Sequence, residues 1–502
     1  MIQSRTPYLN QPLEWDFIEK KKDFFLRLIP ILLLLAITIP FIRSSYWDDE
    51  IFSVVSARSW SGMFRIFREY ENNMSLYLLI LHGWMKLFGD GETATHALSL
   101  LFAALSLPVF YKLERFWFNK TSSLAATLLF ASNPLFVFYA VESRSYSMLV
   151  FSCVLSTLVF VRLLRRPGFG LATLYGVCIA AGVYIHYFGI LLLIVHALAL
   201  TRSNLKLDSM RWFALSAVVF LICILPLALF PPLNKSQIDW ITKPPARFLA
   251  YTIKDLFGGS LVAGLLILCF AFTLWKGYRL KGQDLYLFRF ALVWAVLPAS
   301  LLFVFSWLVK PAYQTRFFVW CIPGAVFLTS LIFAWVPWSR WGKTLVWMLV
   351  LIFFIKGAGS GLQSKGSGYR EAVKYLHANF HRGEIILTYP YFKSIHAGYY
   401  LEKYAGTDSS VRPLVITRQP FLPGGGGIDP DPDMDSLKKM AAAYSRVYLI
   451  CKGSEVPTVT DTVQNRLWLP KIQQTIGNRH PQARTKLFGE GSQDPVRVIV
   501  YE

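Results

Sequence analysis

Long apolar stretches recur along this chain and constrain its fold more than any other feature. The first reads LIPILLLLAITIPFI, and further stretches of bilayer-spanning length follow it up to about residue 358. Of the 502 residues, 54% are hydrophobic and only 16% are charged, which is too apolar for a soluble protein of this size. The sequence therefore predicts an α-helical polytopic membrane protein with about eleven transmembrane helices, at residues 26–43, 94–112, 122–139, 146–164, 170–185, 187–201, 211–231, 259–276, 286–309, 316–336 and 341–358.

The basic residues indicate how the chain is oriented. The formal net charge is +21, but Lys and Arg lie in short segments between the apolar stretches, among them EKKKDFFLR and YKLERFWFNK. This distribution is typical of the positive-inside bias, so we expect the basic connections and the N-terminal tail at 1–25 to be cytoplasmic. No nucleic-acid partner is expected. Because no small-residue cleavage site follows the first apolar stretch, we interpret that stretch as a retained helix.

The remaining segments are then external. Residues 75–90, SLYLLILHGWMKLFGD, could pass for a span, but counting them would reverse the orientation of much that follows. We interpret them as an interfacial helix within an external loop at 44–92, between spans of a transmembrane domain at 26–358. Residues 362–502 predict a small extracytoplasmic α/β domain, with strands at EIILTYP, RVYLICKG and VRVIVYE, a helix at YREAVKYLHANF and a flexible insert, FLPGGGGIDPDPDMD.

Three consecutive carboxylates, Asp48, Asp49 and Glu50, follow the first span on the predicted external face. Mutual repulsion and partial desolvation against an apolar wall would raise the pKa of at least one of them, which suits a general base. The common explanation for a single acidic residue at a membrane edge is a solvated turn. Three together favour a site, and all three remain candidates for the base.

Other predicted external segments carry cations. Arg316 begins a span from the outside, where the positive-inside bias gives it no purpose, and its guanidinium suits a bidentate phosphate contact. The alternative is a side chain that reaches to lipid headgroups. Lys86 on the interfacial helix and Arg144 are further candidates for phosphate binding, although Lys86 could equally bind headgroups. Candidate lining residues are Glu142, Tyr146, His186, Tyr187 and Tyr313.

A base and phosphate-binding cations suit the transfer of a group from a phosphate leaving group. No Gly-rich phosphate loop occurs, so we expect a lipid-carried phosphate donor rather than a nucleotide. The cysteines show no metal-binding spacing, so no metal or cofactor is assigned, and a divalent metal stays open. The alternative function is a multi-pass transporter or flippase of a lipid-linked or anionic substrate, which predicts ionisable residues deep inside the spans. A receptor that presents its external tail would leave the carboxylates and cations unexplained.

Five motifs in order resemble the bacterial glycosyltransferase family 39 group, membrane enzymes of the GT-C fold that include protein O-mannosyltransferases and the aminoarabinose transferase acting on lipid A. They are the acidic pair Asp49-Glu50, LYLLILHGWMKLFG at 76–89, PLFVFYAVESRSYSM at 134–148, the HYFG turn at 186–189, and Arg316-Phe317 through Pro323. The resemblance implies a GT-C catalytic domain in the membrane part. It also implies that a sugar passes from a polyprenyl-phosphate carrier to an envelope lipid, glycan or protein on the outer face of a bacterial inner membrane.

The resemblance also assigns roles to residues. Asp49 would deprotonate the acceptor hydroxyl for an inverting single displacement, Lys86 and Arg316 would hold the donor phosphate, and Glu142 and Arg144 would shape the site. The chain departs from the family pattern in three places, with Ser75 for a proline, His96 for an arginine and Phe317 for a tyrosine. These departures bear on the choice of donor or acceptor more than on the class of reaction.

Overall fold

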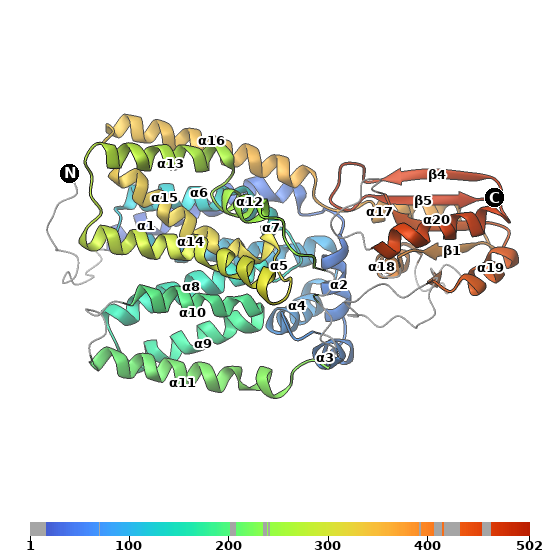
Figure 1. The fold of residues 1–502 in the computed structure, drawn as a ribbon, viewed down its shortest axis with the longest axis horizontal. Helices are drawn as coiled ribbons and strands as arrows, with labels where there is room; N and C mark the ends of the chain where they lie inside the picture. The colour runs from blue at the N-terminus through green and yellow to red at the C-terminus, as the bar shows by residue number, and fades with distance from the viewer. Residues whose placement is uncertain are drawn as a thin grey trace.

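The computed structural model of the chain describes residues 17–69, 71–200, 207–233, 238, 241–390, 393–405, 414–415, 432–453 and 463–502. Most of these residues are helical, and long helices run side by side through one part of the molecule (Figure 1). The helices of this membrane part are α1 Phe17–Thr38, α2 Asp48–Ala57, α3 Trp60–Glu69, α4 Ser75–Phe88, α5 Glu92–Glu114, α6 Lys120–Ser132, α7 Pro134–Ala140, α8 Tyr146–Arg165, α9 Phe169–Ile185, α10 Leu191–Ala199, α11 Leu207–Leu229, α12 Arg247–Leu256, α13 Ser260–Trp275, α14 Gly282–Leu308, α15 Ile322–Trp335 and α16 Arg340–Gln363. Short 3₁₀ helices lie at Ile39–Phe41, Tyr187–Ile190 and Thr315–Cys321.

Each predicted span coincides with a helix or with two consecutive helices. Among the described residues, six helices are long and apolar enough to cross a membrane, or up to eight if each of two bent pairs is one span. The total of eleven stays a prediction. α1 begins at Phe17, so the helix starts earlier than the expected boundary at residue 26, and residues 1–16 of the expected tail lie outside the described residues.

One of the bent pairs has a local cause. α6 and α7 meet at an angle of 61°. Pro134 is the first residue of α7, where its missing N–H costs no hydrogen bond. The Asn133 side chain accepts hydrogen bonds from the backbone N–H groups of Leu135 and Phe136, at 3.0 and 3.2 Å. α6 therefore ends and the capped helix α7 begins with only Asn133 between them. The loop 141–145, which carries the candidate residues Glu142 and Arg144, follows α7.

The C-terminal region is a mixed sheet between two pairs of helices. Its strands are β1 Ile385–Thr388, β2 Leu414–Val415, β3 Val447–Lys452, β4 Ala483–Phe488 and β5 Val496–Tyr501, in the order β2-β1-β3-β5-β4. β1 is parallel to β2 and β3, and β5 is antiparallel to β3 and β4. Its helices are α17 Tyr369–Asn379, α18 Lys393–Ala405, α19 Met434–Ala443 and α20 Val463–Gly477.

Alternation along the strands gives this sheet two apolar faces. Val447, Leu449 and Cys451 pack in the core that includes residues of α19 and α20, whereas Tyr448 and Ile450 belong to the core that includes α17 and α18. The three predicted strands and the predicted helix match β1, β3, β5 and α17. Most of the glycine-rich insert lies outside the described residues.

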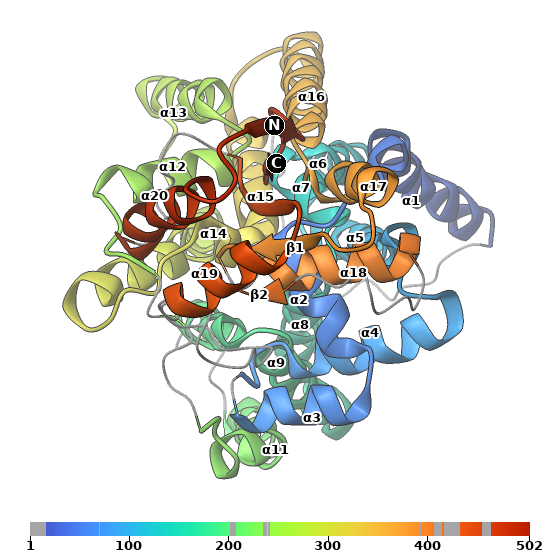
Figure 2. The same cartoon turned by 90° about the vertical axis from the view of Figure 1, so that its right-hand side faces the viewer.

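The C-terminal region covers the end of the membrane part that carries α2, α3 and α4 (Figures 1 and 2). α18 contributes several contacts. The Tyr46 backbone N–H donates to the Tyr400 hydroxyl at 2.8 Å, and Lys403 forms an ion pair with Glu92 at 2.8 Å. The described residues of the segments predicted to be external lie toward this end of the molecule (Figure 1). That this end faces the outside of the cell stays a prediction, as do the domain boundaries.

Candidate functional site

The three adjacent carboxylates are the first three residues of helix α2. Acidic side chains in a first turn are favoured by the exposed N–H groups and the positive end of the helix dipole. Successive residues of an α-helix are rotated by about 100°. Asp48, Asp49 and Glu50 therefore point in three directions and meet three different sets of partners.

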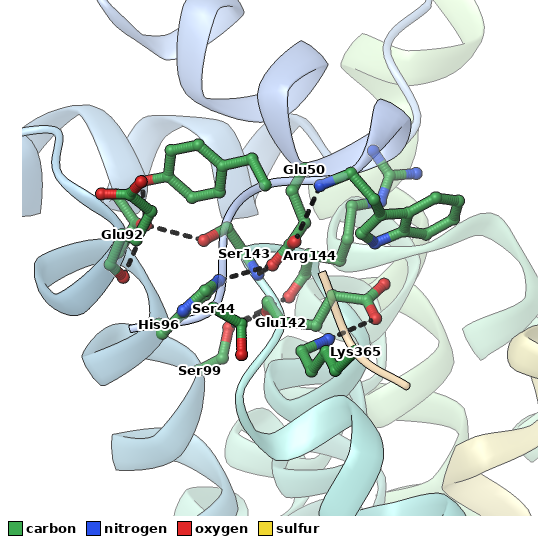
Figure 3. Close-up of polar contacts among 12 residues, drawn as sticks. Ser44, Glu50, Glu92, His96, Ser99, Glu142, Ser143, Arg144 and Lys365 are labelled. Carbon is green, nitrogen blue, oxygen red and sulfur yellow. Dashed lines mark hydrogen bonds and ion pairs between the residues drawn. The ribbon is translucent and has the colours of Figure 1, made fainter. Parts of the chain in front are cut away.

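Glu50 points into the membrane part and is fully buried (Figure 3). One of its oxygens, Oε1, lies 2.7 Å from His96 Nε2 and accepts the Ser143 backbone N–H at 2.8 Å. Burial by itself would raise the pKa of Glu50, but the nearby charges of His96 and Lys365 lower it overall. Glu50 is thus a structural carboxylate that ties α2 to α5 and to the loop before α8.

Asp48 points the other way, into the C-terminal region. Its two oxygens lie 2.8 and 3.0 Å from Lys393 Nζ, and Oδ1 lies 3.1 Å from His396 Nε2. Burial would raise its pKa, but Lys393 and His396 lower it to about 2. The predicted rise in pKa is therefore not found at Asp48 or Glu50, because basic side chains, Lys393 and His96 among them, lie beside these two carboxylates and lower both pKa values.

Asp49 faces a pair of guanidinium groups. Its Oδ2 lies 2.9 Å from Arg316 Nη1, and 28% of its side chain remains exposed. Arg144 Nη1 donates to the Asp49 backbone carbonyl at 3.2 Å and to Ser53 Oγ at 3.0 Å. The Arg316 guanidinium also lies over the Trp47 ring, 5.6 Å from its centroid. Here a partly exposed carboxylate and two cations from distant parts of the chain form a compact polar site.

A buried ion pair supports the loop that carries Arg144. Glu142 Oε2 lies 3.0 Å from Lys365 Nζ, with both side chains fully buried (Figure 3). Burial raises the pKa of Glu142 although Lys365 opposes the shift. The sequence analysis missed Lys365, which follows the last span on the predicted external side. As with Arg316, the positive-inside bias gives a lysine there no purpose, and that signal could have identified it.

His186 and Tyr146 lie beside the two guanidinium groups. The His186 ring is buried, 5.1 Å from the Phe317 ring and 6.3 Å from the Tyr146 ring. Burial and the charges of Arg144 and Arg316 lower the pKa of His186 to about 3, so the ring is neutral. Tyr187 is joined to the loop before α4, because its N–H donates to Asn73 Oδ1 at 2.9 Å.

Two predicted site residues lie apart from this group. Tyr313 is buried against Phe303 and Phe318, with ring centroids 5.5 and 5.2 Å away. Lys86 is exposed near the C-terminal end of α4. In the described part of the chain, no hydrogen bond or ion pair joins Lys86 or Tyr313 to Asp49, Arg144 or Arg316.

The structure adds one carboxyl group that the sequence analysis did not select. Glu71 lies between α3 and α4, where Asn73 Nδ2 donates to its Oε1 at 3.2 Å. Burial raises the pKa of Glu71, with Arg144 opposing the shift and Asp49 adding to it. The only sequence signal was its place in the polar run EYENN, just before the predicted interfacial helix.

Metal-type ligands come together at one place among the described residues. Asp48, His396 and Asp494 offer ligand atoms that lie within 4.8 Å of one another. However, Lys393 Nζ contacts the carboxylate oxygens of both Asp48 and Asp494 at 2.8–3.0 Å. The ammonium group already supplies the positive charge that a metal would bring, and we assign no metal to this cluster.

Comparisons with known proteins agree on the fold. Residues 75–230 match the family described as dolichyl-phosphate-mannose-protein mannosyltransferase. No curated protein sequence matches the chain. Among solved structures, ArnT from Cupriavidus metallidurans is similar in its apo state, with a TM-score of 0.59 and 12% identity, and bound to undecaprenyl phosphate, with a TM-score of 0.61 and 13% identity. Each alignment covers 96% of this chain and 98% of ArnT.

A second solved protein shares the architecture over a smaller part of its length. The apo oligosaccharyltransferase from Archaeoglobus fulgidus aligns with a TM-score of 0.53 and 12% identity, over 87% of this chain and 70% of that chain. The family match lies within the membrane part, and the ArnT alignments include the C-terminal region as well. The chain is therefore a membrane protein of the GT-C fold, similar to the glycosyltransferase family 39 group.

Proposed function

We propose that the protein is a membrane glycosyltransferase that moves a sugar from a polyprenyl-phosphate carrier to a hydroxyl group of an envelope lipid, glycan or protein. The observation that carries this proposal is the placement of Asp49. Of the three adjacent carboxylates, Asp48 and Glu50 contact Lys393 and His96, whereas Asp49 alone pairs with Arg316 next to Arg144, the two guanidinium groups that are candidates for binding the donor phosphate. The similar proteins add weight, since the family name and one ArnT structure both include a polyprenyl phosphate.

The proposed reaction is a single displacement at the anomeric carbon. The acceptor oxygen forms a bond to this carbon as the bond from carbon to the donor phosphate oxygen breaks, so the anomeric configuration inverts. Asp49 takes the proton from the acceptor hydroxyl. Negative charge grows on the departing polyprenyl phosphate, where Arg316 and Arg144 stabilise it. A guanidinium has five N–H donors, so Arg316 can bind Asp49 and a phosphate together.

The test uses the full-length protein in proteoliposomes. A panel of polyprenyl-phosphate sugars is supplied with envelope lipids and glycans, and mass spectrometry follows loss of donor and gain of product. We expect one donor to be consumed, with Asp49→Asn lowering turnover by about 10²- to 10⁴-fold, the range for loss of a general base. The matched control is Asp435→Asn, at a carboxylate on α19 whose side chain is 81% exposed, and it should retain turnover.

Each outcome has a distinct meaning. Full turnover by the folded Asp49→Asn variant would remove Asp49 as the base. Retention of the donor's anomeric configuration in the product, read by NMR, would contradict a single displacement. If no donor is bound or consumed, the transporter or flippase hypothesis gains, and flux of the lipid-linked sugar across the bilayer becomes the deciding assay.

A further inference from the structure

One buried lysine joins the C-terminal region to the helix that carries the candidate base. Lys393 is the first residue of α18, and its side chain has no exposed surface. Its ammonium lies 2.8 and 3.0 Å from the two oxygens of Asp48, and 3.0 Å from both oxygens of Asp494, which precedes β5. A single cation therefore bridges a carboxylate of the membrane part and a carboxylate of the C-terminal region.

We propose that Lys393 is a positioning residue for glycosyl transfer, one that fixes the direction of Asp49 through Asp48. This inference rests on the proposed function of Asp49. Asp48 and Asp49 are consecutive residues in the first turn of α2. Because both residues lie in one helical turn, closed by hydrogen bonds from the Glu50 and Ile51 N–H groups to the Trp47 carbonyl, a shift of the Asp48 backbone carries Asp49 with it. The C-terminal region thereby becomes part of the machinery that aims the base.

The form of the contact favours positioning over simple stabilisation. The Lys393 and Asp494 side chains are buried, and a buried ion pair gains little over apolar packing of similar volume, because desolvation of the charges offsets their attraction. What the arrangement does provide is a fixed orientation of the Asp48 carboxylate. His396, three residues after Lys393 on the same face of α18, places Nε2 3.1 Å from the Asp48 oxygen that Lys393 also contacts. The His396 ring stacks on the Tyr369 ring, with the two centroids 4.5 Å apart. This stacking limits the movement of His396.

Asp49 thus lies between two anchored neighbours. On one side, the membrane part holds Glu50 through His96 and the Ser143 backbone N–H. On the other side, the C-terminal region holds Asp48 through Lys393 and His396. The first turn of α2 is restrained from both directions, and removal of either anchor takes away the restraint on that side. An error of about 1 Å in the position of a reacting group can cost about 100-fold in rate.

The experiment removes Lys393 without leaving Asp494, its partner in the C-terminal region, as an unpaired buried carboxylate. The double variant Lys393→Met with Asp494→Asn takes away both ionisable groups, and turnover is measured in the proteoliposome assay with the donor that the native protein consumes. We expect kcat to fall by about 10- to 100-fold, while the KM for the donor stays unchanged because Arg316 and Arg144 are untouched. The matched control is Glu402→Gln, which breaks the exposed 2.8 Å ion pair with Arg58 between the same two parts. It should leave kcat unchanged.

The outcomes separate this inference from the proposed function. If the native protein transfers a sugar and the double variant, shown to be folded by its unfolding temperature, keeps the native kcat, the positioning role is overturned. If the double variant does not fold, Asp48→Asn provides the second test, because it weakens the hold on α2 while Lys393 and Asp494 stay paired. A native kcat in Asp48→Asn would likewise overturn the inference. If the native protein transfers no sugar at all, the proposed function fails first and the role of Lys393 falls with it.

Discussion

At the scale of single residues, the chain shows how neighbours of one chemical type can take unrelated roles. Asp48, Asp49 and Glu50 all carry a carboxylate group, but the helical rotation directs the three side chains to the C-terminal region, to the guanidinium pair and to the core of the membrane part, respectively. Their environments then set their chemistry. The cationic partners of Asp48 and Glu50 keep the pKa values of both low, and each of these carboxylates is occupied by a structural contact.

We expect Glu50→Ala to destabilise the protein strongly. The substitution leaves His96 Nε2 and the Ser143 N–H buried without the acceptor they now share. Breaking a buried, hydrogen-bonded charge pair costs about 3–5 kcal/mol. Thermal unfolding in detergent, followed by tryptophan fluorescence, measures the loss. Glu490→Ala, at an exposed position near β4, is the control and should change stability by less than about 0.5 kcal/mol. Equal unfolding temperatures for both variants would show that the buried network contributes little.

Arg316 should act on donor binding. We expect Arg316→Gln to raise the KM for the lipid-linked sugar by about 10- to 100-fold, because a charge-assisted hydrogen bond contributes about 1.5–3 kcal/mol. Arg316→Lys keeps the charge but loses the planar fork, so its defect should be intermediate. Steady-state kinetics over a range of donor concentrations measures both. An unchanged KM in the glutamine variant would exclude Arg316 from the donor site.

At the scale of elements, close contacts between helices hold the turn that carries Arg316 in place. Arg316 lies in the 3₁₀ turn that leads into α15, and α15 packs against α14 through Gly324. A Cβ atom at Gly324 would lie 2.7 Å from Trp294 Cγ, well inside contact distance. Small residues allow membrane helices to approach this closely. The position of Arg316 therefore depends on a glycine that makes no contact with the site.

Gly324→Ala should accordingly destabilise the membrane part by about 1–3 kcal/mol, the usual cost of overpacking a filled core. The control is Gly264→Ala on α13, where an added Cβ would meet no atom within 4 Å. Thermal unfolding of the two variants in the same detergent provides the comparison. A Gly324→Ala protein as stable as the control would mean that α14 and α15 can separate without cost.

At the scale of the whole molecule, the junction between the membrane part and the C-terminal region should make stability depend on pH. Burial and the nearby Asp48 raise the pKa of Asp494 to about 7, from 3.8 for the free side chain, although Lys393 opposes the shift. The folded protein therefore holds this proton more tightly than the unfolded chain does. The contribution of Asp494 to the free energy of unfolding is complete below about pH 4 and is lost as the pH rises from about 4 to about 7.

We expect the unfolding temperature of the native protein to fall more between pH 5 and pH 7.5 than that of Asp494→Asn, which has no carboxyl group to ionise there. Asp48, Lys393, His396 and Tyr369 face the same cluster and are present in both proteins, so the difference between the two isolates Asp494. Scanning calorimetry or fluorescence across this range measures it. Identical pH dependence in the two proteins would contradict the raised pKa of Asp494.

The sequence by itself determined the membrane class, the positions of the helices within the predicted spans, and three strands of the sheet. Those features depend on local patterns, namely bilayer-length apolar runs, short alternating strands and the charges between them. The same patterns placed Asp49, Arg144 and Arg316 on one side of the membrane, and in the structure the three residues lie together. Five short motifs, rather than these patterns, carried the resemblance to GT-C enzymes, and the structure and the comparisons agree with that fold.

Only the tertiary structure decided what each charged residue contacts. Apart from the family resemblance, no local pattern within YWDDEIF distinguishes Asp49 from its neighbours, because the partners of Asp48 and Glu50 are Lys393 and His96, far away in the chain. The same holds for the pairing of Glu142 with Lys365. Such pairs depend on how helices and the C-terminal region pack in space. Local sequence sets where an element begins and which face is apolar, whereas the choice of charged partners is made when distant elements meet.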